Sequence, residues 1–84
     1  MYIRGLDMPH INIKMYPGRS EDVKQKLADA IVKDVLSVAK CDEKWVSVAI
    51  EEIDSAEWPE KVYKPEILDK QDKLYKKPGY NPFE

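Results

Sequence analysis

Two short segments of the chain alternate between apolar and polar residues, residues 9–16 and residues 45–53. A period of two is typical of a strand with one buried face, so the pattern predicts two β-strands. The apolar positions that set this period are Ile11, Ile13 and Met15 in the first segment and Val46, Val48 and Ile50 in the second.

A helical period lies between the two predicted strands. Pro17 and Gly18 end the first strand, and Ser20 is a residue type favoured at helix N-caps. Apolar residues then recur every three or four positions as far as Lys40, which predicts an amphipathic helix of about five turns. The positions of this apolar stripe are Val23, Leu27, Ala30, Ile31, Val35 and Val38.

Residues 9–53 therefore predict a βαβ unit, in which the crossover is right-handed and the two strands are parallel. Two strands do not make a stable sheet alone, and one helix covers only one face of it. We therefore expect a second subunit to cover the other face.

Residues 54–84 predict a different kind of structure. Two prolines delimit two short helical stretches, residues 59–64 and 66–76. Residues 77–83 are rich in turn-forming residues and contain two aromatic residues, so we expect an irregular strap that packs against the rest of the domain.

The composition limits the classes of function. The 84 residues carry 14 Lys+Arg and 16 Asp+Glu, a net charge of −2, and the mixed signs argue against a nucleic-acid partner. No apolar run is long enough for a membrane span or a secretory signal, which predicts no membrane partner and a cytoplasmic location. Cys41 is the single cysteine, so neither a disulfide nor a metal site is expected, and no metal or organic cofactor is predicted.

The chemical candidate that stands out is Pro9, which follows Met8. If translation starts at Met8, removal of the methionine leaves a free N-terminal proline. The pKa of its secondary amine would fall towards neutrality beside apolar walls or a cation, so the amine could accept and return protons. On residue type alone, a proline that simply opens a strand is the favoured alternative.

Two other candidates are weaker. His10 lies on the polar face of the first strand, where a surface or subunit-contacting histidine is the simpler interpretation. Glu51 and Glu52 are adjacent in the second strand, so their side chains point to opposite faces and do not form a carboxylate dyad.

The order of these features resembles a known family. Pro9, a short strand, Gly18-Arg19-Ser20, the helix, the second strand and Trp58 together are similar to the 4-oxalocrotonate tautomerase family of N-terminal-proline enzymes, over about residues 9–58. The segment Lys76-Lys77-Pro78-Gly79-Tyr80 is similar to longer members that act as phenylenolpyruvate-type tautomerases.

The resemblance implies an α+β fold, with a βαβ tautomerase-like unit, short C-terminal helices and a dimer whose four-stranded sheet is backed by two helices. A homodimer is favoured over a hexamer, because the longer C-terminal segment would occupy the surface that hexamers use. We expect residues 9–84 to form a single domain, and residues 1–8 to be an extension that arises from a misassigned start or from cloning.

The resemblance also implies roles for individual residues. Pro9 would be the general base, Arg19 would bind a substrate carboxylate, and Trp58 would wall the pocket and exclude water. Ser47 stands where dicarboxylate-using members carry a second arginine, which makes a monocarboxylate the expected substrate. Lys76 could supply replacement charge from the strap, although exposed tail lysines are usually only solvated.

The implied function is an isomerase, a keto–enol tautomerase that acts on a small enol or 2-oxo acid such as phenylenolpyruvate. Two alternatives stay open: a catalytically silent oligomerising or small-molecule-binding module, and a proline-based dehalogenase-type activity. Arg19 could instead pair with Glu21 or Asp22, and Trp58 could be a plain core or interface residue. If Met1 to Asp7 are retained, the Pro9 nitrogen is an amide and cannot act as a base.

Overall fold

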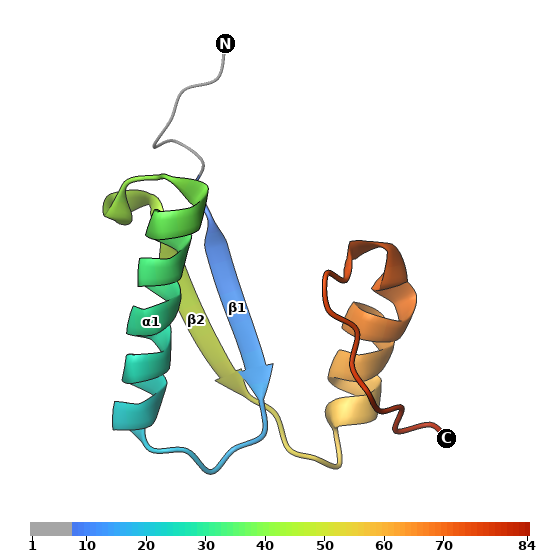
Figure 1. The fold of residues 1–84 in the computed structure, drawn as a ribbon. Helices are drawn as coiled ribbons and strands as arrows, with labels where there is room; N and C mark the ends of the chain where they lie inside the picture. The colour runs from blue at the N-terminus through green and yellow to red at the C-terminus, as the bar shows by residue number, and fades with distance from the viewer. Residues whose placement is uncertain (1–7) are drawn as a thin grey trace.

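The structure, a computed structural model, describes residues 8–84, so residues 1–7 of the expected extension lie outside the described residues (Figure 1). The described part of the chain begins with a strand and a long helix. A short 3₁₀ turn then leads into the second strand, and two helical segments follow that strand. These elements are β1 (His10–Met15), α1 (Glu21–Ala39), η1 (Glu43–Trp45), β2 (Ser47–Glu52), η2 (Pro59–Ile67) and η3 (Leu68–Lys73). The predicted βαβ order is confirmed.

β1 and β2 pair in parallel, in a register that runs from His10 opposite Ser47 to Met15 opposite Glu52. α1 lies along one face of this two-stranded sheet (Figure 1). Val48 and Ile50 of β2 line a groove together with Ala28 of α1, so the apolar positions of the strands face the helix.

The other face of the sheet differs from the expectation. Because side chains alternate along a strand, this face carries mainly polar residues. They are His10, Asn12 and Lys14 of β1 and Ser47, Ala49 and Glu51 of β2. The expectation that this face needs apolar cover is therefore wrong. Within residues 8–84, each of the two strands has one edge that pairs with no other strand.

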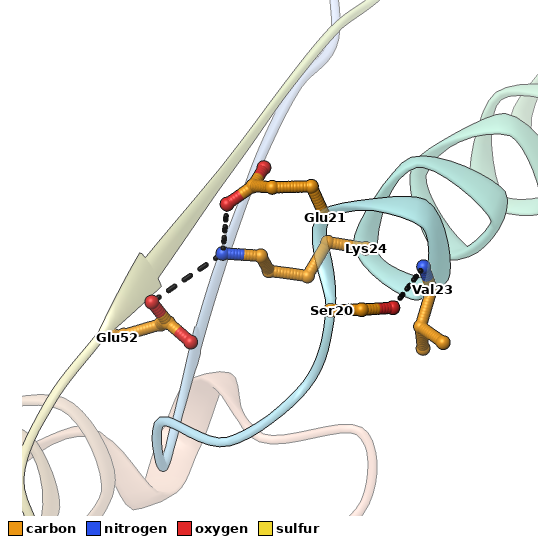
Figure 2. A network of polar contacts seen from close by, with 5 residues as sticks. All are labelled: Ser20, Glu21, Val23, Lys24 and Glu52. Atoms are coloured by element: carbon orange, nitrogen blue, oxygen red, sulfur yellow. Dashed lines mark hydrogen bonds and ion pairs between the residues drawn. The ribbon is translucent and has the colours of Figure 1, made fainter.

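The N-terminus of α1 is built as the sequence predicts. The Ser20 hydroxyl oxygen accepts a hydrogen bond from the Val23 backbone N–H at 3.2 Å. In the first turn, the Lys24 ammonium contacts Glu21 at 2.8 Å and Glu52 of β2 at 3.3 Å, which ties the helix to the sheet (Figure 2). At the other end, the C-cap Lys40 adopts a left-handed conformation with φ of 60°.

The apolar stripe of α1 is only partly covered. Val23 is 46% exposed and Val38 is 81% exposed, although both were expected on the buried face. A helix of 19 residues is about 28 Å long, whereas strands of six residues are about 20 Å long, so both helix ends extend beyond the sheet. The half-buried apolar residues lie in the middle of the helix: Leu27, Ala28, Ile31, Val32, Val35 and Leu36.

The sequence predicts a helix break at Pro65, but Pro65 lies inside η2. η2 is a π-helix, and Pro65 has no backbone N–H to donate within it. The helical hydrogen bonds continue after the proline, where the Leu68 N–H donates to the carbonyls of Tyr63 and Lys64. The second helical segment, η3, ends at Lys73 rather than at residue 76.

The most deeply buried residues of the described chain are Val62 and Tyr63 of η2, each 5% exposed. The strap packs on Tyr63, whose ring lies 5.4 Å from that of Tyr80 and 6.0 Å from that of Phe83. The Tyr63 hydroxyl also donates a hydrogen bond to the Tyr80 carbonyl at 3.1 Å. The C-terminal segment therefore has its own small aromatic core. No helix within residues 8–84 is long and apolar enough to cross a membrane.

Candidate active site

A cleft of about 420 Å³ lies at the C-terminal end of β1. Three parts of the chain meet there: the end of β1 with the turn that follows it, the residue before η2, and the strap. The lining residues are Lys14, Met15, Tyr16, Arg19, Trp58 and Tyr80. Gly18 has φ of 129°, a conformation that other residues rarely adopt, and it sets the path of the turn that carries Arg19.

Aromatic side chains form one wall of the cleft. The rings of Tyr16 and Trp58 meet edge to face, with centroids 5.2 Å apart. The indole N–H of Trp58 donates to the Tyr80 hydroxyl oxygen at 3.0 Å. Because a tyrosine hydroxyl can accept and donate at once, Tyr80 keeps its own proton for a second acceptor.

The two cations of the cleft differ in their partners. The Lys14 ammonium forms an ion pair with Glu66 of η2, and this hydrogen bond raises the pKa of Lys14 above that of an ordinary lysine. Arg19 forms no ion pair with any residue in the range 8–84. The alternative that it pairs with the first turn of α1 is not observed, because Glu21 contacts Lys24, and Asp22 contacts Lys26 at 3.2 Å.

Pro9 lies at the opposite end of β1. Its carbonyl accepts a hydrogen bond from the Ser47 N–H at 3.1 Å, and the Ser47 hydroxyl lies 2.6 Å from Nδ1 of His10. Four strand residues separate Pro9 from Lys14, the first residue of β1 that lines the cleft, so the two lie about 17 Å apart along the strand. Within one protomer, the structure therefore brings Arg19 and Trp58 together but places Pro9 and Ser47 elsewhere.

Lys76 does not line the cleft. It is exposed, and its ammonium lies 3.5 Å from the Lys77 carbonyl. The strap contributes Tyr80 to the cleft instead.

Four lining residues were missed by reasoning from the sequence: Lys14, Met15, Tyr16 and Tyr80. Lys14 is read in the sequence as one of the polar positions of β1, and nothing in that pattern shows where a strand ends in space. Tyr80 belongs to the segment that resembles the longer family members, which was the available signal. Among residues 8–84, no three histidine, cysteine or acidic side chains are grouped so that they could hold a metal ion.

Residues 9–59 match the family model described as tautomerase enzyme. The chain belongs to the tautomerase family. A relative named "Probable tautomerase" from Xylella fastidiosa strain 9a5c is 41% identical over 73 residues, which span 87% of this chain and 89% of the relative. Tautomerase PptA of Cronobacter sakazakii is 36% identical over 74 residues, which span 87% of this chain and 97% of that protein.

Solved structures of tautomerase relatives share the fold. N2, a member of the 4-oxalocrotonate tautomerase family, has a TM-score of 0.58 at 26% identity and covers 63% of this chain and 83% of its own. YwhB, a homologue of 4-oxalocrotonate tautomerase, has a TM-score of 0.54 at 28% identity, and the match covers 55% of this chain and 75% of YwhB. The predicted family and the predicted α+β fold are therefore confirmed. The family match ends at Pro59, where η2 begins.

Proposed function

We propose that this tautomerase-family chain is a keto–enol tautomerase, an isomerase that acts on a small enol or 2-oxo acid with one carboxylate and an aromatic or apolar body, such as phenylenolpyruvate. The observation that carries the proposal is the cleft, in which Arg19 lies with Trp58 and Tyr80. A guanidinium group matches the planar shape of a carboxylate, and aromatic side chains suit a flat unsaturated body.

In the proposed reaction, Pro9 is the N-terminal residue and its neutral secondary amine is the base. The amine takes the proton of the enol hydroxyl and becomes a prolyl ammonium. The carbonyl then forms at C2, and the electron pair of the C2–C3 double bond takes the proton of the ammonium to form a new C–H bond at C3. The amine is neutral again at the end, so no cofactor is consumed. The family match, which begins at Pro9, supports this proposal.

A second copy of the chain is proposed to bring Pro9 to the cleft. Pro9 and the cleft lie at opposite ends of β1, and the outer edge of β1 has no partner strand within residues 8–84. Antiparallel pairing of two β1 strands would place the start of one beside the end of the other and give a four-stranded sheet backed by two helices. A dimer is favoured over a hexamer, because the C-terminal segment adds bulk outside the family match.

The test compares two forms of the same chain, one translated from Met1 and one from Met8. The intact mass of each form shows whether it begins at Pro9, and a ketonisation assay on phenylenolpyruvate measures turnover. The form that keeps the extension is the matched control, because its remaining residues are identical. We expect turnover only in the form that begins at Pro9, and its loss in Pro9→Ala.

Equal turnover by both forms would refute the role of Pro9 as the base. Absence of turnover in both, with retained binding of a small carboxylate, would instead support the alternative of a silent small-molecule-binding module.

A further inference from the structure

Lys14 is a second cation of the cleft, and it is already occupied. Its ammonium forms an ion pair and a hydrogen bond with Glu66, which comes from η2. The Lys14 side chain is 23% exposed and that of Glu66 is 41% exposed, so the pair is partly shielded from water. Glu66 is not itself among the residues that line the cleft.

The cleft therefore presents one uncompensated positive charge to a ligand. Arg19 has no acidic partner within residues 8–84, whereas the charge of Lys14 is neutralised by Glu66. A ligand with one carboxylate can bind to Arg19 alone. A second carboxylate near Lys14 would have to compete with Glu66 for the ammonium and would be repelled by it.

We propose that Glu66 is a specificity-determining residue, which restricts the cleft to ligands with a single carboxylate because it occupies Lys14. This inference rests on the proposed function for the position of the ligand, and it explains the expected monocarboxylate preference by a residue other than Ser47. Glu51, which is opposite Lys14 in the sheet register, stays beside the lysine when Glu66 is neutralised and limits the size of the effect.

The test uses two unreactive anions of the same length, sorbate and trans,trans-muconate. Muconate carries a second carboxylate where sorbate carries a methyl group, so the ratio of their affinities measures only the response to the second charge. Isothermal titration gives both dissociation constants for the full chain, for Glu66→Gln and for Glu60→Gln. Glu60 is an exposed residue of η2, so its variant is the control with the same change in net charge.

We expect the wild-type chain and Glu60→Gln to bind sorbate more tightly than muconate. Glu66→Gln should shift the ratio towards muconate about tenfold, the value of one hydrogen bond to a charged group. The shift should disappear in Glu66→Gln/Lys14→Met, because the freed ammonium is then absent. An unchanged ratio in Glu66→Gln, or an equal shift in Glu60→Gln, would overturn the inference.

Circular dichroism checks that Glu66→Gln is folded, since the substitution removes the ion pair with Lys14. If Glu66→Gln is not folded, Lys14→Met/Glu66→Met, which removes both charges, provides the test. If Lys14 is occupied by Glu66, this replacement leaves the wild-type ratio unchanged within about twofold. A fall in muconate affinity relative to sorbate would show that Lys14 binds the second carboxylate, and the inference would be wrong.

Failure of this inference and failure of the proposed function are distinguishable. Both anions bind without reacting, so the affinity ratio does not depend on Pro9 or on turnover. A chain with turnover on phenylenolpyruvate but no response to Glu66→Gln keeps its proposed function and loses the inference. A chain without turnover that shows the tenfold response keeps the inference and loses the proposed function.

Discussion

Replacement of Ser20 by alanine tests how the start of α1 is held. The Ser20 hydroxyl oxygen accepts one hydrogen bond, from the Val23 N–H at 3.2 Å, and it is the side-chain cap of the helix. The backbone bond from Lys24 N–H to the Ser20 carbonyl, at 3.1 Å, survives the substitution. Only one donor loses its partner, and water can reach it, so we expect a loss of about 1 kcal/mol in the free energy of unfolding.

A loss of that size is measurable in a chain of this length. Each 1 kcal/mol lowers the Tm of a small domain by about 4–8 °C, and urea unfolding gives the free energy directly. All variants are compared at one protein concentration, because association with a second copy would make the apparent stability depend on concentration.

The matched control for this prediction is Ser37→Ala. Ser37 is an exposed serine of the same helix, and alanine has the higher helix propensity, so this change should be neutral or stabilising by a few tenths of a kcal/mol. Ser20→Asp should restore most of the stability, because aspartate also caps helices. If Ser20→Ala is no less stable than Ser37→Ala, the hydroxyl does not cap α1 and the reasoning is refuted.

Three further predictions concern individual side chains. Tyr63→Phe loses the 3.1 Å hydrogen bond to the strap and should cost about 0.5–1.5 kcal/mol in urea unfolding; no loss would mean that the strap is held without it. Lys24→Met should lower the urea midpoint at pH 8, because the substitution removes the contacts with Glu21 and Glu52. Those contacts raise the pKa of Lys24 above that of an ordinary lysine, so the difference should shrink as the pH rises through that raised pKa; a constant difference would contradict an ionic bridge. Arg19→Met should weaken sorbate binding at least about tenfold by titration, whereas Lys26→Met should not; equal effects would remove Arg19 from the site.

The sequence predicted the βαβ part of the fold well, because its signals are local. The strand period, the Ser20 cap and the helical period each act over a few residues, and the bounds of α1 agree with them. The degree of burial was not predictable in the same way. Whether Val38 is covered depends on how far the sheet reaches along the helix, and the helical period alone contains no information on the relative lengths of the two elements.

The cleft was predicted only in part, for a different reason. Arg19 and Trp58 were identified through the family resemblance, whereas the contacts that define their surroundings join residues far apart in the chain. Lys14 and Glu66 are separated by 52 positions, and Trp58 and Tyr80 by 22. A charge pattern read along the chain assigns Lys14 to a solvated strand face, and only the folded structure gives it a partner.

The family match separates residues 9–59 from residues 60–84, and the residues of the cleft come from both parts. The match covers β1, α1 and β2 and ends at Pro59, so the proposed base and the proposed carboxylate-binding arginine both lie within it. Tyr80, which lines the cleft, and Glu66, which holds Lys14, lie beyond it in the segment with its own buried residues. Because this segment packs on its own aromatic core, its residues can change without disturbing the helix–sheet contact. Under the proposed function, substitutions in residues 60–84 should therefore alter ligand preference while the proposed proton transfer by Pro9 is kept, and the Glu66 variants test that separation directly.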